Sequence, residues 1–530
     1  MISIIIPPDA LWDEHKGIYT PTRRMKAREI PIRFQYFPDP GEPGVDMNAG
    51  LRLSGQASLY YPQVSFTIDA RDRYGADDFN YRFFQQRELN TFSSLYLRNA
   101  GVPDHRSTFF RDALQQTLVL NKIDIDCQAY QPAVLFLNGQ YWGIYNIRDK
   151  INPDYIASLH QVNPDDIDLL EYELGSSRPE VMAGDDENYN QLYDYIKETD
   201  LSVEAHFRFL ETWMDMDEFI NYQVCEIFCD NVFWPEQNVR MWRERKEGAR
   251  WRWILFDTDF GFGMPNNRSS GYTNNTLEYA TSSNQSGFTA PEWATMILTR
   301  LMDNEEFRTR FIQRFDGLLN TVFHPDTVLG VINTLQDNLA PEMQRHIDRW
   351  RDGEFYYGDP IRSYSEWNSN VNVMKNFARY RPGYTRQHLV DYFDLSGTSR
   401  LEVKVEEPDA GRVEINGIVT VDSSTSGIYC SDVPVVLRAI PCPGYRFDRW
   451  EGTGADTLNP TEVTLVEDSL TVKAIFEPMA VSLLPSRISG DTVLARENSP
   501  YYTGGDIVVD SGTTLRIQSG VGSSWRSVPA

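Results

Sequence analysis

Apolar and polar residues alternate along much of the first 150 residues. The segments 30–37 and 51–75 contain runs in which every second residue is apolar, a period typical of strands with one buried face. The segment 132–149 contains two such runs around Asn138-Gly139, a dipeptide typical of two-residue hairpin turns. We therefore predict that this part of the chain consists mainly of strands.

Helical spacing replaces this alternation at three places. Residues 109–121 carry apolar residues three and four positions apart, and so do several stretches of 291–397. A third helix is predicted to start at Met216, with Asp215 and Glu218 as a capping box.

The stretch 226–263 brings both patterns to a cluster of polar side chains. It is predicted to contain the end of a helix, a loop, and two strands at 238–243 and 251–256. Asp257 and Asp259 directly follow the second strand. Because residues two apart in an extended chain point to the same side, both carboxylates are expected to leave the strand on one face.

Further oxygen donors lie upstream of these aspartates, in Asp230, Asn231 and Asn238. Carboxylates and a carboxamide beside the end of a strand suit a hard cation such as Mg²⁺. A D-x-D pattern also occurs in turns that side-chain hydrogen bonds close without any metal. The residues alone leave both interpretations open.

The chain changes character at about residue 400. The polar segment 264–290 before this point is predicted to be a long loop beside the site. Residues 400–478 carry period-two runs separated by turns, which indicates a small β domain, and short strands are expected in 482–530. The predicted fold class is α+β, followed by one or more small all-β domains.

Composition limits the possible functions. At 530 residues the chain is too long for a single hydrophobic core. Its formal net charge of −26 disfavours binding to nucleic acid, which requires a basic surface. No run approaches about 20 apolar residues, so no membrane-spanning segment is predicted. The oligomeric state is left open.

The cysteines and the N-terminal segment bear on the compartment. Cys127, Cys225 and Cys229 lie in apolar segments and are expected to be buried thiols. Cys430 and Cys442 flank a predicted strand and are candidates for a local disulfide. The first residues lack the basic and apolar regions of a signal peptide, so we expect that a leader is absent from this sequence or that the chain is a fragment.

Several segments of residues 1–397 resemble the CotH family, spore-coat-type proteins with an atypical protein-kinase fold. The segments that carry the resemblance are LRLSGQASLYYPQVSFTIDARDRYG (51–75), LYLRNAG (95–101), RDAL (111–114), QAYQPAVLFLNGQYWGIYNIRDK (128–150), WPEQNVRMWRER (234–245) and RWRWILFDTDFGFG (250–263). The resemblance implies two lobes, a strand-rich one over about 1–150 and a helical one over about 151–397.

The resemblance also implies binding of ATP and Mg²⁺ and transfer of phosphate to serine or threonine of a protein substrate. Carried over to this chain, Asp257 is the main metal ligand and Asn238 the second-metal residue, with Asp259 as the alternative metal ligand. Asp259 also begins a literal kinase DFG triplet. We interpret that triplet as coincidental, because the family pattern is D-x-D.

The sequence departs from the family pattern at the catalytic base. Many members carry an aspartate directly before the Trp-Pro dipeptide, where this chain has Phe233. A phenylalanine can neither take nor orient a proton. Asp230, three residues earlier, is the candidate replacement.

A second departure concerns the phosphates. Members usually carry a lysine in the strand after Pro62, where this chain has Gln63 and Val64. Arg52 and Arg71 are candidates to hold the phosphates instead, although an arginine presents a different shape of donor. Asp149 supplies the acidic residue that the family places near the end of the long hairpin.

The C-terminal residues resemble other modules. Residues 400–478 are similar to a bacterial surface repeat of the internalin B-repeat type, through GRVEING (411–417), GYRFDRWEG (444–452) and LTVKAIFEP (470–478). Residues 490–517 resemble the first coils of a parallel β-helix that is cut short. The surface-type repeat implies an extracellular or cell-surface location.

Two functions remain as hypotheses. The first is a kinase with displaced catalytic groups that acts on an exported or surface protein. The second is a catalytically impaired pseudokinase that binds a surface ligand as an adhesion module, which Phe233, Val64 and the β repeat favour. Other enzyme classes are disfavoured, since the sequence has no HExxH, no G-x-S-x-G and no Walker lysine loop.

Overall fold

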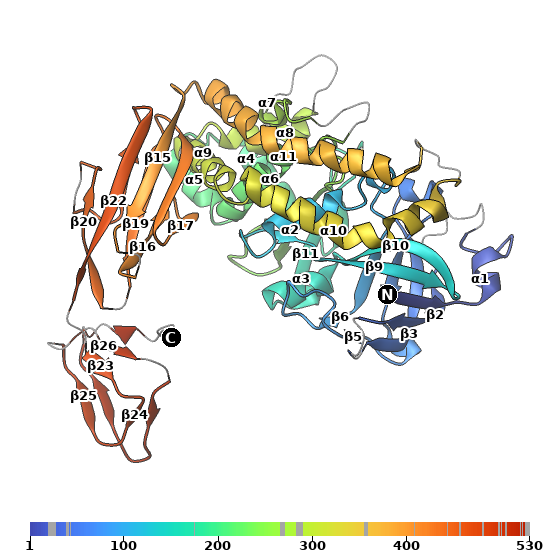
Figure 1. Ribbon diagram of the computed structural model, residues 1–530, viewed down its shortest axis with the longest axis horizontal. Coiled ribbons are helices and arrows are strands. Elements are labelled where there is room, and N and C mark those ends of the chain that lie inside the picture. The colour runs from blue at the N-terminus through green and yellow to red at the C-terminus, as the bar shows by residue number, and fades with distance from the viewer. Residues whose placement is uncertain are drawn as a thin grey trace. The chain divides into compact units, whose positions relative to one another are not determined.

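The chain forms two compact units (Figure 1). The first comprises Met1–Phe311 and Thr321–Phe393, and the second comprises Ile312–Asn320 and Asp394–Ala530. The fold is α+β with an all-β C-terminal region, as the sequence predicts. The computed structural model describes residues 1–19, 28–38, 42, 44–173, 175–264, 271–281, 290–353, 359–407, 409–442, 444–454, 457–479, 482–496, 499, 501–503, 506–519, 521 and 523–524.

Strands of the first unit close into a barrel. Its order is β1 (Ile2–Ile5), β2 (Ile30–Tyr36), β3 (Val45–Ser54), β4 (Ser65–Asp69), β7 (Ser94–Arg98), β10 (Gln140–Asp149) and β9 (Tyr130–Leu137). Neighbours pair antiparallel except β1 and β9, which pair in parallel and complete the ring. The hairpin predicted at Asn138-Gly139 is confirmed, since it joins β9 to β10.

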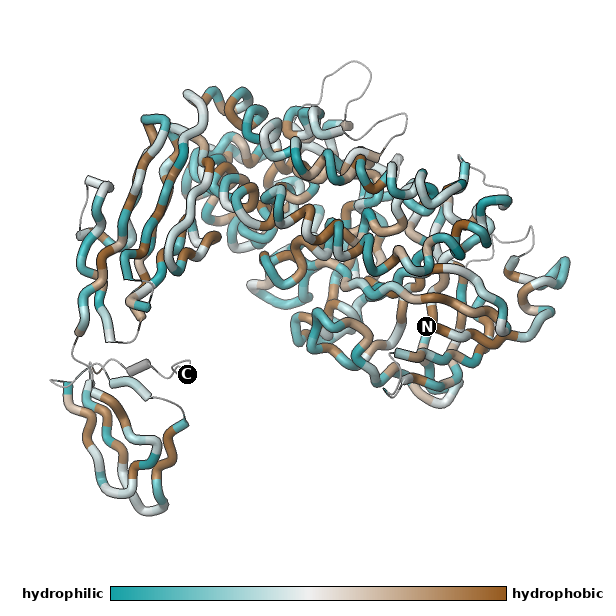
Figure 2. The backbone as a smooth tube through the Cα atoms, viewed as in Figure 1, coloured by the Kyte–Doolittle hydropathy of each residue, from teal (hydrophilic) through white to brown (hydrophobic). Residues whose placement is uncertain are grey.

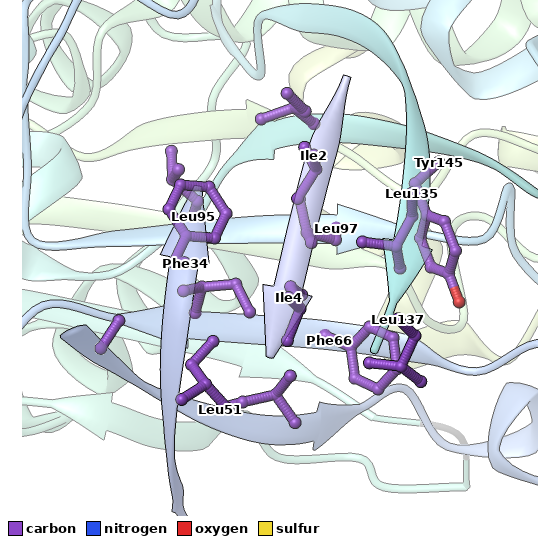
Figure 3. Packing of buried hydrophobic residues seen from close by; sticks show 14 of the residues in the cluster. Ile2, Ile4, Phe34, Leu51, Phe66, Leu95, Leu97, Leu135, Leu137 and Tyr145 are labelled. Atoms are coloured by element: carbon purple, nitrogen blue, oxygen red, sulfur yellow. The ribbon is translucent and has the colours of Figure 1, made fainter. Parts of the chain in front are cut away.

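Aliphatic and aromatic side chains fill the inside of the barrel (Figure 3). Leu51 of β3 and Leu97 of β7 belong to this core and are fully buried. Successive side chains of a strand point to opposite faces, so the neighbouring Arg52 and Tyr96 lie on the outer face of the barrel. The alternation read from the sequence therefore separates an apolar interior from a polar exterior.

A second sheet lies in the same unit. Its order is β12 (Glu180–Ala183), β11 (Ile167–Tyr172), β13 (Val239–Glu244), β14 (Arg252–Leu255) and β8 (Asp126–Cys127). The strands predicted at 238–243 and 251–256 are confirmed to within one residue at each end, as β13 and β14. Two shorter strands, β5 (Phe79–Asn80) and β6 (Thr91–Phe92), pair with each other.

Helices surround these sheets. They are α1 (Pro8–Trp12), α2 (Arg111–Val119), α3 (Pro153–His160), α4 (Glu187–Glu198), α5 (Glu204–Leu210), α6 (Met216–Cys229), α7 (Thr276–Thr281), α8 (Glu292–Leu301), α9 (Glu305–Leu319), α10 (Pro325–Trp350) and α11 (Tyr364–Phe393), with short 3-10 turns η1 (Ala57–Tyr60), η2 (Asp72–Tyr74), η3 (Asp104–Arg106) and η4 (Pro164–Asp166). The predicted helices are confirmed as α2, α6 and α8–α11. Figure 1 shows α10 and α11 side by side.

The capping box predicted for α6 is wrong. Asp215 makes no side-chain cap and instead pairs with Arg250 at 3.0 Å and Arg252 at 2.8 Å. Glu218 Oε2 accepts a hydrogen bond from the Trp253 amide at 2.9 Å. The two carboxylates therefore bind groups in and next to β14 and do not cap the first turn of α6.

The second unit is built on two four-stranded sheets. Their orders are β18 (Ser424–Cys430), β15 (Thr398–Val405), β22 (Ser469–Pro478), β20 (Tyr445–Glu451), and β17 (Val419–Val421), β16 (Gly411–Ile415), β19 (Pro434–Pro441), β21 (Thr461–Thr464). Figure 2 shows hydrophobic and hydrophilic residues alternating along these strands, whose apolar faces form one core that includes Trp450. The small β domain predicted over 400–478 corresponds to this region.

Short strands that pair in parallel follow the two sheets. They are β23 (Ser482–Leu484) with β26 (Tyr501–Thr503) and β29 (Ser523–Ser524), β24 (Arg487–Ile488) with β27 (Val508–Val509), and β25 (Thr492–Leu494) with β28 (Leu515–Ile517). This pairing repeats in sequence order, as it does in a parallel β-helix. The assignment to that fold stays a prediction.

Three further expectations can be compared with the structure. The disulfide between Cys430 and Cys442 is not formed. Of the predicted loop 264–290, residues 271–281 are described and contain α7, while 265–270 and 282–289 lie outside the described residues. None of the helices that the structure describes is both long and apolar enough to cross a membrane.

Candidate active site

Two aspartates and one arginine form the centre of the candidate site. Asp257 and Asp259 follow β14, and Arg98 Nη2, at the end of β7, pairs with both carboxylates, at 2.8 Å from Asp259 Oδ2. The side chain of Asp257 is 36% exposed, whereas Asp259 and Arg98 are buried. The two carboxylates therefore converge on one point, and a buried cation holds them there.

The backbone reaches this arrangement through a turn. Asp257 has a φ of +54°, in the left-handed region, so the chain is not extended between the two aspartates. Asn238, predicted to be the second-metal residue, donates from Nδ2 to the Asp257 carbonyl oxygen at 3.0 Å. The carboxylates meet because of this turn rather than because of strand periodicity, which corrects the reasoning from the sequence.

Gly101 allows the close approach at this centre. It has a φ of +82°, and a Cβ at this position would lie 1.7 Å from Asp259 Oδ2 and 2.6 Å from Arg98 Nη2. Any side chain here would overlap the ion pair. The segment LYLRNAG thus supplies both the arginine and the space that the pair occupies.

A second buried ion pair, between Arg148 and Asp112, stabilises the turn from Asp257 to Asp259. Arg148 Nη2 lies 2.9 Å from Asp112 Oδ2, and both side chains are buried. Asp112 Oδ1 accepts hydrogen bonds from the amide and hydroxyl of Thr258 at 3.0 and 3.2 Å. Burial alone would raise the pKa of Asp112, but the charges of Arg148 and Arg98 lower it overall. Asp112 therefore stays ionised and fixes the residue between the two aspartates.

Two carboxyl groups at and near the centre, those of Asp259 and Glu226, have raised pKa values. Burial raises the pKa of Asp259 well above its ordinary value, and the charge of Asp257 adds to the effect while Arg98 opposes it. Burial also raises the pKa of Glu226, on α6, to about 8, although a hydrogen bond from Asn231 at 3.0 Å opposes the shift. Such shifts are common at functional sites, where charged groups are held out of water.

Asp230, the candidate base, accepts hydrogen bonds from the segment that leads into α7. Its carboxylate accepts hydrogen bonds from the Gly271 amide at 2.6 Å, Asn274 Nδ2 at 2.9 Å and Thr276 Oγ1 at 2.6 Å. It is 4% exposed, and burial raises its pKa, with the charge of Arg381 opposing. In this arrangement the carboxylate positions the chain around 271–276.

The two arginines predicted to hold phosphate lie together on the outer face of the barrel. Arg52 forms a two-point contact with Asp69, at 2.7 and 3.1 Å, and Arg71 Nε lies 3.0 Å from Glu29 Oε2. Both line one cavity of about 200 Å³. The structure therefore brings these two predicted residues together.

Asp149 lies elsewhere. Its register partner on the neighbouring strand β7 is Leu95, a core residue. The side chain of Asp149 therefore points into the barrel. It is 1% exposed, accepts a hydrogen bond from the Ala129 amide at 2.6 Å, and lies 3.7 Å from Arg87 Nη1. Asp149 does not line the cavity that Arg52 and Arg71 share.

The positions that depart from the family pattern are filled by packing groups. The ring of Phe233 lies 3.8 Å from that of Phe260, centroid to centroid, next to Asp259. Val64 is fully buried in the barrel core, and Gln63 Nε2 donates to the Ile144 carbonyl oxygen at 2.8 Å. None of these side chains can supply the base or the cation that it replaces.

The oxygen donors at the centre could supply part of the coordination of a Mg²⁺ ion. Across the described ranges, no group of three or more His, Cys, Asp or Glu side chains is arranged to hold a metal ion. Two carboxylates do converge, and Asp259 Oδ1 is buried with no hydrogen-bond partner in the part of the chain that the structure describes. Two carboxylates fit a Mg²⁺ ion that takes its remaining ligands from phosphates and water.

Sequence reasoning missed several residues of this centre. Arg98, Asp112 and Arg148 received no role, although each lies in a segment that resembles the CotH family. The sequence pattern also predicts no role for Glu226 or Lys150. The usable signal was the occurrence of charged residues inside otherwise apolar strands and helices, since a buried charge requires a partner.

Two protein families match the chain. The CotH kinase protein family matches residues 51–385, more than half of the chain, and this range contains every group that converges at the centre of the site. The divergent InlB B-repeat domain matches residues 412–480, in the second unit. No curated protein matches the chain.

Proposed function

The chain belongs to the CotH kinase family, and we propose from this that it is a CotH-like protein kinase that transfers phosphate from ATP to serine or threonine of an exported or surface protein. The observation that carries the proposal is the convergence of Asp257 and Asp259 on one point inside the family match. The barrel would form the strand-rich lobe of an atypical two-lobed kinase. The second sheet and its helices would form the other lobe.

The site offers residues for most parts of this chemistry. Asp257 and Asp259, with Asn238 beside them, would be the ligands of Mg²⁺, which neutralises the charge of the phosphates when bound. Arg52 and Arg71 would orient the phosphate oxygens from the barrel side. Arg98 holds the two carboxylates close together by pairing with both, and Asp112 fixes the turn between them.

Among the described residues of the site, no free carboxylate lies at the position of the base that would remove the proton from the acceptor hydroxyl. Asp230 would have to leave three hydrogen-bond partners to act as the base. Loss of an aligned base typically costs about 100- to 10,000-fold in rate. We therefore expect slow phosphate transfer.

The InlB-type repeat supports an extracellular or cell-surface location, because modules of this kind display a domain at the bacterial surface. A protein at the same surface would then be the phosphate acceptor.

Calorimetry of the full chain with ATP, with and without Mg²⁺, tests the proposal. We expect binding that depends on Mg²⁺, followed by slow transfer of labelled phosphate to the chain itself or to casein. Asp257→Ala should abolish both, whereas Asp326→Ala, which removes a carboxylate from α10 that is 89% exposed, should change neither. Absence of both binding and transfer in the unmodified chain would contradict the proposal.

A catalytically impaired pseudokinase that acts as a binding or adhesion module is the second candidate, and the contact between Phe233 and Phe260 favours it. Phe233→Asp places a carboxylate where the family has its base, and Phe233→Ala controls for the lost ring contact. A large gain of transfer for Phe233→Asp alone would show that this position limits the activity. Transfer by the unmodified chain that disappears in Asp257→Ala would contradict the pseudokinase.

A further inference from the structure

The outer face of the barrel carries a row of polar side chains across neighbouring strands. Arg52 of β3 pairs in register with Thr67 of β4, Thr67 with Tyr96 of β7, and Tyr96 with Arg148 of β10. Residues in register across a sheet share a face. Lys150 directly follows the end of β10, and its Nζ lies 5.4 Å from the centre of the Tyr96 ring, so it lies beside this row.

The end of this row borders the cavity of about 200 Å³. Among the residues that line it are Arg52, Arg71, Lys150, Asp69 and Ser94. Its cations come from β3, from the turn after β4 and from the end of β10. Three separate segments therefore place cations at one cavity, which the carboxylates of Asp69 and Asp154 also line, in a chain whose net charge is −26.

The three cations differ in how they are neutralised. Arg52 pairs with Asp69 at 2.7 Å and Arg71 with Glu29 at 3.0 Å. Lys150 Nζ has no hydrogen bond or ion pair with any residue of the described ranges, and it lies 5.4 Å from the centre of the Tyr96 ring. Burial, together with the nearby charges of Arg240 and Arg52, lowers the pKa of Lys150 to about 8, although the charges of Glu171 and Asp69 oppose this shift. An unneutralised, half-buried ammonium group is costly unless an anion completes its surroundings.

The cavity is connected to the aspartate centre through one strand. Tyr96, whose ring Lys150 contacts, is two residues before Arg98 on the same face of β7, and Arg98 holds Asp257. An anion on Lys150 would thus lie on the face of the barrel that carries the site.

We propose that Lys150, with Arg52 and Arg71, binds the polyphosphate of a nucleoside triphosphate and replaces the lysine that the family carries on the strand after Pro62. The inference rests on the proposed function. The usual position cannot serve here, because Gln63 and Val64, which stand there, are both buried and neither carries a charge. Lys150 directly follows a different strand, β10, so the cation is supplied without a change in fold.

Chemical labelling tests the site without reference to catalysis. The full chain is treated at about pH 8 with an acetylating reagent, and the modification of each lysine is measured by mass spectrometry. We expect Lys150 to be protected by tripolyphosphate and by Mg-ATP, and to be protected less by inorganic phosphate. The exposed Lys246 should be modified equally in all samples.

Calorimetry with matched variants completes the test. Lys150→Gln should weaken the binding of tripolyphosphate and of Mg-ATP by about 10- to 100-fold, the range expected for one charge-assisted contact. Lys246→Gln should leave both affinities unchanged. Thermal unfolding of each variant shows whether it is folded, and the labelling result does not depend on any variant.

The outcomes separate this inference from the proposed function. Protection and weakened binding for tripolyphosphate but not for ATP would support the anion site and contradict the kinase. Normal ATP binding and transfer in Lys150→Gln, with no protection of Lys150, would overturn the site and leave the kinase standing. Absence of binding by both ligands in the unmodified chain would overturn both.

Discussion

Gly101 sets how closely the backbone can approach the ion pair of Arg98 and Asp259. We predict that Gly101→Ala destabilises the fold by more than about 2 kcal/mol, because it adds a left-handed alanine, which costs about 1–2 kcal/mol, to a steric overlap. The new Cβ would lie 1.7 Å from Asp259 Oδ2. Urea unfolding measures the change.

Gly139 provides the matched control for this substitution. Its φ of +78° is close to the +82° of Gly101, but a Cβ there would meet no atom within 4 Å. Gly139→Ala should therefore show the backbone cost alone. Equal destabilisation by the two variants would mean that the ion pair tolerates a methyl group, contrary to this account of the site.

The buried carboxyl group of Glu226 makes the free energy of unfolding depend on pH. Its pKa is 4.5 ordinarily and about 8 in the folded chain. Between these values the unfolded chain has released the proton that the folded chain retains, so stability falls as pH rises, by at most about 1.4 kcal/mol per pH unit. Below the lower value both states are protonated and the cost disappears.

Glu226→Gln should remove this dependence, because an amide stays neutral and still accepts the hydrogen bond from Asn231. We predict that the variant gains stability over the unmodified chain progressively from about pH 5 to about pH 8, and that the gain then levels off. Unfolding free energies at several pH values test this. Glu247→Gln, at an exposed glutamate, should show no such trend, and a flat difference for Glu226→Gln would contradict the assignment of a buried, protonated carboxyl group.

At the scale of elements, Arg381 of α11 ties together the end of α6 and the start of α7. It donates to the carbonyl oxygens of Phe228 at 3.0 Å and Ile227 at 2.7 Å, and to Thr276 Oγ1 at 2.9 Å. We predict that Arg381→Met costs about 3–5 kcal/mol, because it leaves buried carbonyl groups and the Asp230 carboxylate without a cation. Urea unfolding measures the loss, and hydrogen exchange over 271–281 should increase.

Arg379 lies on the same helix but is exposed, and its contact is with Asn376 at 3.0 Å. Arg379→Met should change stability by no more than about 0.5 kcal/mol. A similar small effect for Arg381→Met would show that α6 and α7 keep their positions without this arginine.

The elements were predictable where local pattern determines them. The Asn138-Gly139 turn and the apolar runs beside it specify β9 and β10, and the apolar run before Asp257 specifies β14. The start of α6 was not predictable in its detail, because Arg252 and the Trp253 amide, on another element, take the groups that would have capped it.

The centre of the site shows the same limit. Asp257 and Asp259 lie close together, as the sequence predicts, but they do so through the turn at Asp257, and their shared partner, Arg98, lies about 160 positions earlier in the chain. The role of Lys150 could not be predicted from local sequence for a related reason. Its importance depends on the register of four strands, and a one-residue shift of any one of them would turn that strand's residue of the polar row inward.

At the scale of the whole molecule, α9 belongs to both compact units. Its residues up to Phe311 are in the first unit, and its residues from Ile312 on, with the following Asn320, are in the second. Asp316 Oδ2 accepts a hydrogen bond from the Cys430 amide at 2.9 Å, and Asn320 exchanges hydrogen bonds of 2.9 and 3.1 Å with the backbone of Ile428. The predicted division near residues 397–400 therefore separates this helix from strands that satisfy its polar groups.

We predict that a chain ending at Ser396 is less stable than one ending at Met479. The shorter chain loses the partners of Asp316 and Asn320, at about 1 kcal/mol for each hydrogen bond, and also the packing of Ile418 on Gly317. The longer chain keeps all of these contacts and should unfold at the temperature of the full chain. Differential scanning calorimetry measures both. If the two shortened chains unfold at the same temperature, α9 does not depend on the β-sheets, and the kinase-family region can be studied alone. If they differ as expected, negative results with an isolated kinase region would say nothing about the activity of the intact protein.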